Sequence, residues 1–106
     1  DNRIQKVLSH IRKNIYKTVD IDSLAAISCL SKDHFIRLFK KEVGTTPLQY
    51  INQKKIEKAQ LILITEDIPV KNIAYLLAYE DHSYFNRLFK KITDVTPQQY
   101  RELYKK

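Results

Sequence analysis

The apolar residues of this chain recur at helical spacing along nearly its whole length. The first group, at positions 4, 7, 8, 11 and 15, follows the spacing i, i+3, i+4, i+7, i+11. That spacing predicts one buried stripe on a helix over about residues 3–16. No segment alternates apolar and polar residues as a half-buried strand does. The pattern therefore predicts an all-α fold.

Capping residues divide the rest of the chain into further helices. Asp20 is expected to cap a short helix, and Ser31 a second helix that runs to Gly44, the natural residue just past a helix end. Thr46 followed by Pro47 predicts the start of a long helix over about residues 47–64. Its residues available for burial, on more than one side, are Tyr50, Ile51, Ile56, Ala59, Leu61 and Leu63.

An internal repeat with an offset of 50 residues organises the chain. The sequence RLFKK occurs at 37–41 and again at 87–91, TP at 46–47 and 96–97, and QY at 49–50 and 99–100. Upstream, LA at 24–25 matches IA at 73–74 at an offset of 49, so the second copy has one extra residue between its two helices. We interpret the chain as one domain, residues 1–106, with a first module in 1–46, a linking helix in 47–64 and a second module in 65–106.

Each repeated unit fits helix-turn-helix geometry, in which the second helix of the motif enters the major groove of DNA. The inward stripes are Phe35, Leu38 and Phe39 in the first copy and Phe85, Leu88 and Phe89 in the second. Exposed side chains near the N-terminus of the second helix would reach base edges, where Arg pairs with guanine and Asn with adenine. Lysines toward its C-terminal end suit phosphate contacts. The phosphate candidates are Ser31, Lys32, Lys40, Lys41, Thr46, Lys90, Lys91 and Thr96.

The net charge agrees with such a partner. Lys and Arg number 19 against 12 Asp and Glu, so the formal charge is +7, and basic residues are in excess in both halves of the chain. Charge of this kind favours a polyanion such as nucleic acid or an acidic membrane face.

Composition excludes several other classes of protein. The lone Cys29 cannot form an internal disulfide or a zinc finger, and the lone Gly44 excludes a phosphate-cradling glycine loop. The longest apolar runs, such as residues 61–64, are far too short to span a membrane, and no signal-peptide pattern is present. His10, expected at the surface, has no metal-ligand spacing to His34 or His82. We therefore expect a cytoplasmic protein without cofactor, metal or catalysis. Cys29 is expected to be a small buried residue rather than a nucleophile or sensor thiol.

One stretch of the second copy carries a specific resemblance. Residues 73–101, with IA at 73–74, DHSYFNRLFKK at 81–91, TP at 96–97 and YR at 100–101, resemble the signature of the AraC/XylS family of bacterial transcription regulators. The similarity covers essentially the whole chain. It implies seven helices, two helix-turn-helix motifs and a long linking helix. The base-reading residues that it implies are Asp33, Ile36 and Arg37 in the first motif and His82, Ser83, Asn86 and Arg87 in the second.

The resemblance also implies partners. Members of the family activate or repress promoters and usually carry a separate sensing or dimerisation domain. The expected partners are therefore double-stranded DNA, RNA polymerase and such a domain. The absence of Met, with Asp at position 1, suggests a piece of a longer chain.

Two departures from the family pattern leave alternatives open. Cys29 and Ala78 stand where the family often has glycine, so either these turns adopt negative φ or they are mildly strained. Asp33 stands where the family often has a neutral or aromatic residue, and it would either accept from a cytosine amino group or only stabilise the helix end. Tyr50 and Tyr100 are expected to pack each module's third helix against its core rather than to stack on bases.

Other readings of the whole chain also remain open. The first helix could bind a membrane surface or a partner through its apolar face. The repeat could instead form a helical interaction module for an acidic protein. Weak binding to random duplex DNA whose affinity falls strongly with salt concentration would support DNA binding, whereas such an interaction module should not bind the duplex. The sequence does not define the operator, the effector, the direction of regulation or the oligomeric state.

Overall fold

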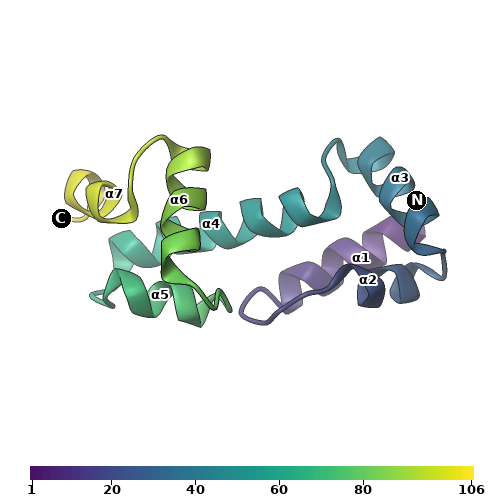
Figure 1. Ribbon diagram of the computed structural model, residues 1–106, viewed down its shortest axis with the longest axis horizontal. Coiled ribbons are helices and arrows are strands. Elements are labelled where there is room, and N and C mark those ends of the chain that lie inside the picture. Colours follow the sequence, from purple (N-terminus) through teal and green to yellow (C-terminus); the bar gives the residue numbers. More distant parts are fainter. The chain divides into compact units, whose positions relative to one another are not determined.

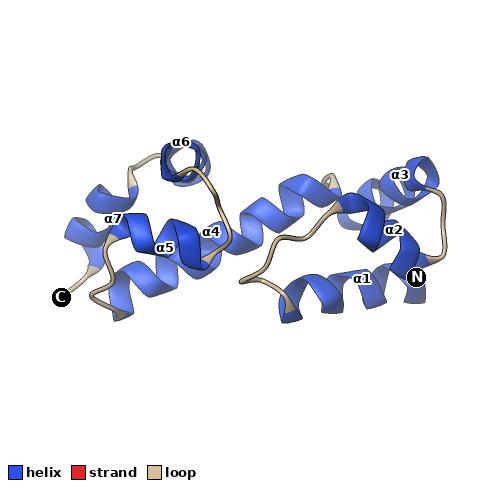
Figure 2. Ribbon diagram, turned by 60° about the horizontal axis from the view of Figure 1, so that its bottom comes forward, coloured by secondary structure: helices blue, strands red, loops and turns tan.

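The structure, a computed structural model, describes residues 1–106, and all of its regular elements are helices (Figure 1, Figure 2). In chain order they are α1 (Asn2–Lys13), α2 (Ile21–Ser28), α3 (Lys32–Val43), α4 (Pro47–Thr65), α5 (Val70–Leu76), α6 (His82–Thr93) and α7 (Pro97–Tyr104). The predicted all-α fold with seven helices, two helix-turn-helix motifs and a long linking helix is confirmed. The motifs are α2–α3 and α5–α6.

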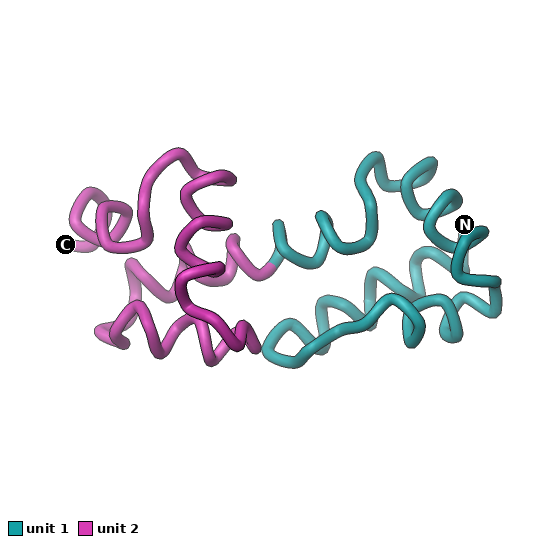
Figure 3. Tube along the Cα trace, viewed as in Figure 1, with its two compact units in different colours: residues 1–54 teal, residues 55–106 magenta.

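The chain divides into two compact units, residues 1–54 and residues 55–106 (Figure 3). The division falls inside α4, so this helix contributes its first part to one unit and its second part to the other. Each unit has a separate hydrophobic core, because the short helices of a motif cannot bury their apolar faces alone.

The core of the first unit is built on α1, α2, α3 and the start of α4. Its buried members are Ile4, Val7, Ile11, Leu24, Ala25, Phe35, Phe39 and Ile51. Phe35 and Phe39 are fully buried, which stabilises the fold by about 2 to 3 kcal/mol for each side chain. The position of α3 is therefore determined by the two phenylalanines that the repeat predicted to point inward.

The core of the second unit has the same plan. Its buried members are Ile56, Ala59, Ile62, Leu63, Ile73, Ala74, Leu77, Phe85 and Phe89. Leu88 packs partly buried against this core, as Leu38 does in the first unit. The predicted inward stripes are thus confirmed, with the phenylalanines buried more deeply than the leucines.

The long helix α4 differs from its prediction at one position. Leu61 was expected to be available for burial but is 50% exposed, whereas Ile62 is buried. A residue two positions after the buried Ala59 lies on nearly the opposite side of a helix with 3.6 residues per turn. Leu61 therefore faces solvent.

The first helix is shorter than predicted and ends at Lys13 rather than near residue 16. Asn14 stops it, because the Asn14 side-chain amide donates to the His10 carbonyl oxygen at 2.8 Å. Asn side chains compete in this way with the helical ladder. Ile15 is nevertheless buried, so the predicted stripe continues past the helix end.

The turns inside the two motifs resolve the question left by the missing glycines. Cys29 has φ of 60° and Ala78 has φ of 67°, so both turns use left-handed backbone. In each turn two N–H groups donate to carbonyl oxygens of the preceding helix. In the first turn Leu30 N–H donates to the Ala25 carbonyl oxygen, and in the second turn Tyr79 N–H donates to the Ala74 carbonyl oxygen. This arrangement requires a left-handed residue, and it is strained for any residue with a Cβ.

The prediction that Cys29 is buried is wrong. Cys29 is exposed, because its left-handed backbone at the end of α2 turns the side chain away from the core. The preceding residue, Ser28, is buried instead, and its hydroxyl donates to the Ala25 carbonyl oxygen at 2.7 Å. Hydrogen bonding makes the burial of this hydroxyl tolerable.

Candidate nucleic-acid interface

The helices α3 and α6 are held by equivalent aromatic contacts. The ring of Phe39 meets Tyr50 edge-on at 5.7 Å between centroids, and the ring of Phe89 meets Tyr100 in the same way at 5.6 Å. Such pairs add about 0.5 to 1.5 kcal/mol to simple burial. The prediction that both tyrosines pack a third helix against the core is confirmed.

Each of the two helices begins with a side-chain cap. The Ser31 hydroxyl accepts from the His34 N–H at 3.3 Å, and the Asp81 carboxylate accepts from the Ser83 N–H at 2.8 Å. Asp33 lies in the first turn of α3, where a carboxylate is favourable against the helix dipole. The helix-end role suggested for Asp33 therefore has a structural basis that does not require DNA.

Most of the candidate residues on α3 and α6 lie at the surface. The exposed ones are Ser31, Lys32, Asp33, Arg37, Lys40 and Lys41 on the first motif and Ser83, Arg87, Lys90 and Lys91 on the second. Lys32 also forms an exposed ion pair with Asp22, with 3.5 Å between nitrogen and oxygen. A single ion pair at the surface contributes little, so Lys32 can exchange it for another anion. The two arginines occupy the same position in both motifs, one turn before the lysine pairs.

Ile36 is a base-reading candidate and is therefore expected to be exposed, and the structure corrects this expectation in part. Ile36 is only partly exposed and packs against the core of the first unit. An apolar side chain on the edge of the buried stripe gains more from the core than from water. Only the remaining edge of Ile36 can contact a base.

Asn86 and His82 are also partly buried. The Oδ1 atom of Asn86 is buried and accepts no hydrogen bond, so its side chain is not fully presented to solvent. The His82 ring meets Tyr75 edge-on at 6.5 Å between centroids. The second motif thus presents Ser83 and Arg87 openly, and Asn86 and His82 at its margin.

Thr46 and Thr96 take part in identical capping boxes. The Thr96 hydroxyl accepts from the Gln99 N–H at 3.1 Å, and the Gln99 side chain accepts from the Thr96 N–H at 2.9 Å. The pair Thr46 and Gln49 does the same at 3.2 and 3.1 Å. A threonine hydroxyl that accepts in a cap keeps its own hydrogen for donation. Capping therefore leaves room for the phosphate contact predicted for these two residues.

Sequence reasoning missed Lys55. This lysine of α4 is 4% exposed, and its Nζ donates to the Leu77 carbonyl oxygen at 2.6 Å. Burial lowers the pKa of Lys55 to about 8, because removal from water disfavours the charged form. The signal was present in the sequence, since Ile51, Lys55 and Ala59 form an i, i+4 row whose other members are apolar.

Sequence reasoning also missed a clamp at the end of α4. The Arg101 guanidinium donates to the carbonyl oxygens of Leu63 and Glu66 at 3.0 and 3.1 Å, and Lys105 donates to the Glu66 carbonyl at 2.6 Å. Lys105 also pairs with Asp67 and thereby lowers the pKa of that carboxyl. These cations satisfy carbonyls that have no partner within the helix.

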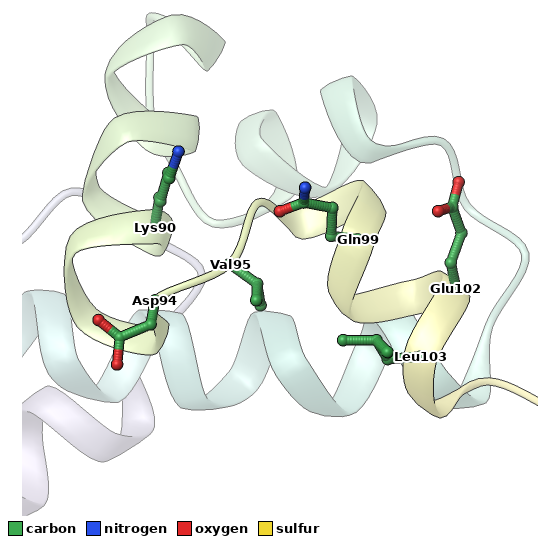
Figure 4. Close-up of a pocket in the computed structure, with 6 residues that line it drawn as sticks. All are labelled: Lys90, Asp94, Val95, Gln99, Glu102 and Leu103. Atoms are coloured by element: carbon green, nitrogen blue, oxygen red, sulfur yellow. The ribbon is translucent and has the colours of Figure 1, made fainter.

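An open groove lies beside the C-terminal end of α6 (Figure 4). It has a volume of about 520 Å³ and is lined by Lys90, Asp94, Val95, Gln99, Glu102 and Leu103. In the close-up, Lys90 and Asp94 come from α6 and the turn after it, and Gln99 and Glu102 come from α7. Two carboxylates beside one lysine make this groove a poor site for a phosphate.

No group of three or more His, Cys, Asp or Glu side chains is arranged to hold a metal ion. None of the seven helices combines the length and the apolar character needed to cross a membrane.

Comparison with known proteins gives one family and several relatives. Residues 24–103 match the family described as a helix-turn-helix domain. The chain is 34% identical over 94 residues to the MmsAB operon regulatory protein of Pseudomonas aeruginosa, covering 89% of this chain and 31% of that protein. It is 30% identical over 102 residues to the arabinose operon regulatory protein of Escherichia coli, covering 95% of this chain and 35% of that protein.

A solved structure agrees with the fold. The C-terminal domain of AraT, a response regulator from Geobacillus stearothermophilus, superposes with a TM-score of 0.94 at 25% identity, covering 100% of this chain and 88% of that one. The chain spans about a third of the length of the two regulatory proteins above. What is shared with them is therefore one domain of a longer protein.

Proposed function

Since this chain belongs to the helix-turn-helix domains of the AraC/XylS family of transcription regulators, we propose that it binds duplex DNA sequence-specifically through α3 and α6. Each helix would enter its own segment of the major groove. For the functional division we propose a first module in residues 1–46, a linking helix in 47–64 and a second module in 65–106.

One observation supports this function above the others. Arg37 and Arg87 are exposed at the same position of two helices that are anchored by the same phenylalanine and tyrosine contacts. An arginine on such a helix can donate two hydrogen bonds to a guanine edge. The exposed lysine pairs at 40–41 and 90–91 follow one turn later, and lysines on such a helix suit contacts with the phosphate backbone.

The roles of single residues are proposals of the same kind. The base-reading set is Asp33, Ile36, Arg37, His82, Ser83, Asn86 and Arg87. The phosphate set is Ser31, Lys32, Lys40, Lys41, Thr46, Lys90, Lys91 and Thr96. Arg37, Ser83 and Arg87 are the strongest members of the base-reading set, because their side chains are exposed, whereas the equally exposed Asp33 has a favourable position in the first turn of α3 that does not require DNA.

Two further partners are proposed on the family relation alone. One is RNA polymerase, which a regulator of this family would recruit or hinder at its promoter. The other is a sensing or dimerisation domain in the full-length protein. We also propose a non-catalytic, cytoplasmic role, in keeping with the regulatory proteins that the chain resembles.

The function is tested by a mobility shift on random duplex DNA over a series of salt concentrations, followed by selection of bound sequences from a random pool. We expect weak binding to random DNA that falls with salt at a log-log slope of roughly −0.9 per phosphate contact. Selection should then return one preferred site. Binding that is absent, or unchanged between low and moderate salt, would favour the helical interaction module instead.

A further inference from the structure

Lys55 and Ser28 are the buried polar residues of this protein. Lysine is rarely buried fully unless its ammonium group is paired. Lys55 lies on α4 among residues of the second core, with Ile56 and Ala59 beside it, and 4% of its surface is exposed. Its burial therefore depends on what its ammonium group contacts.

The ammonium group contacts the turn of the second helix-turn-helix motif from two sides. Its Nζ donates to the carbonyl oxygen of Leu77, the residue that ends α5, at 2.6 Å. The same Nζ lies 5.7 Å from the ring centroid of Tyr79. Between these two contacts is Ala78, with φ of 67°. Lys55 thus holds both neighbours of the strained residue of the turn.

This contact is favourable for two physical reasons. A carbonyl at the end of a helix has no partner inside the helix and carries partial negative charge, so a cation is a suitable donor for it. The face of a tyrosine ring also attracts a cation. Burial raises the pKa of Tyr79 above its usual value, so the ring next to the ammonium group remains a neutral phenol.

The first module lacks a contact equivalent to the one that Lys55 makes with the turn, which we call the Lys55 clamp. The helices α1 and α4 match at an offset of 52, because the buried Ile4 and Ile11 correspond to Ile56 and Leu63. At this offset Arg3 corresponds to Lys55. The Arg3 guanidinium does not reach the turn and instead donates to the Asp1 carboxylate at 2.9 and 3.2 Å.

We propose that Lys55 is a positioning residue of the second recognition helix: by holding the turn at Leu77 and Tyr79 it sets the position of α6 and thereby the base preference of the second module. This inference rests on the proposed DNA binding. The turn leads directly into the cap of α6 at Asp81, and the next residues are base-reading candidates. Hydrogen bonds to base edges require side chains held within about 0.5 Å, so a displaced turn alters which bases fit.

The contact itself can be tested without DNA, by amide hydrogen exchange on the wild-type protein, Lys55→Met and the control Arg3→Met. In Lys55→Met the Ala78 and Tyr79 N–H groups should exchange about tenfold faster or more, because local opening is easier once the clamp is lost. The corresponding Cys29 and Leu30 N–H groups should not change. Arg3→Met should leave all four unchanged. Equal protection of Ala78 and Tyr79 in Lys55→Met and wild type would overturn the proposal.

The effect on DNA is tested with the site selected by the wild-type protein. The readout is the ratio of affinity for that site to affinity for single-base variants of each block. A partly unfolded protein binds all of these duplexes less well but keeps the same ratio. Lys55→Met should lower the ratio about fivefold or more in one block, as loss of one well-placed base contact would. Lys55→Arg, which keeps the charge and the donors, should restore it, and Arg3→Met should not change it.

Failure of the Lys55 proposal can be distinguished from failure of the proposed DNA binding. A ratio unchanged in Lys55→Met, together with faster turn exchange, would mean that Lys55 only stabilises the module. Absence of DNA binding by the wild-type protein would overturn the proposed function, while the exchange experiment would still decide the contact. If circular dichroism shows that Lys55→Met does not fold, Lys55→Gln replaces it, since the glutamine amide keeps polar N–H groups and loses the charge. Lys55→Gln must then show the same two effects.

Discussion

Three residues other than glycine adopt left-handed backbone: Cys29, Ala78 and Asp94. Each ends a helix or lies in the turn just after one, where left-handed geometry lets the next N–H groups satisfy the last carbonyls. At the end of α3 the equivalent position is Gly44, which adopts the same geometry without strain. The protein therefore tolerates at three turns a strain that glycine would remove.

Replacement of Cys29 or Ala78 by glycine should therefore stabilise the protein. We expect each variant to raise the free energy of unfolding by up to about 1 kcal/mol, the strain of a left-handed Cβ less the extra chain entropy of glycine. Urea unfolding measures the change. As a control, Ala26→Gly inside α2 should destabilise by about 1 kcal/mol. Destabilisation by both turn variants would show that the left-handed backbone is not strained.

The buried ammonium of Lys55 makes stability depend on pH. Its pKa is about 8 in the folded protein and 10.5 when exposed, so between these values the unfolded chain binds more protons. Stability should consequently rise with pH above 8. Relative to Lys55→Met, the wild type should gain up to about 1 kcal/mol between pH 7 and pH 9, after allowance for solvent screening. Denaturant unfolding of both proteins at the two pH values measures this, and a difference that falls with pH would contradict it.

At the scale of elements, α4 serves two cores with different parts of its surface. Ile51 packs in the first core, and Ile56 and Leu63 pack in the second. The end of the helix is held by Arg101, whose counterpart in the first copy is the apolar Ile51. The repeat therefore diverges where the third helix of each copy differs in role: in the first copy it continues as α4, and in the second copy it folds back as α7 on the end of α4.

Loss of the Arg101 clamp should loosen this end of the helix. Arg101→Met keeps the stem and removes the donors to the Leu63 and Glu66 carbonyls, which should cost about 1 to 2 kcal/mol. Thermal unfolding followed by circular dichroism measures the loss. Lys106→Met, at an exposed position, is the matched control and should change little. Equal melting temperatures for the two variants would show that the clamp contributes no stability.

At the scale of the whole molecule, two modules with the same helix-turn-helix plan predict a site made of two blocks. The modules differ at Asp33 and Ser83 and at Ile36 and Asn86, so the blocks should have different sequences and need not form a palindrome. Such an arrangement allows a single chain to recognise an asymmetric operator.

The two-block site is tested with Arg37→Ala and Arg87→Ala. Each should cost roughly 1 to 3 kcal/mol of binding and relax the preference at a few base pairs, because an arginine that pairs with guanine is lost. The two variants should affect separate blocks in a selection experiment. Lys91→Ala, by contrast, should weaken binding to all sequences alike. If both arginine variants lost preference at the same base pairs, the assignment of one block to each module would be refuted.

The helical class, the repeat and the inward phenylalanines could all be predicted from the amino-acid sequence. These features depend on local chemistry: the 3.6-residue period selects the buried face, and N-capping residues such as Ser31 and Thr96 mark where a helix begins. The exposed arginine positions follow from the same period, since Arg37 lies opposite the stripe of Phe35 and Phe39. A pattern that repeats within one helical turn needs no knowledge of distant residues.

Features that depend on a neighbouring element could not be predicted in this way and required the packed fold. Lys55 could be recognised as a clamp only once α4 was packed against the turn at Leu77, 22 residues further along the chain. The partial burial of Ile36 and Asn86 and the exposure of Cys29 likewise depend on how the motif's helices meet and on the sign of one φ angle. The reason is physical: whether a polar side chain can be buried depends on whether a partner lies within hydrogen-bond distance, and residues remote in sequence provide that partner.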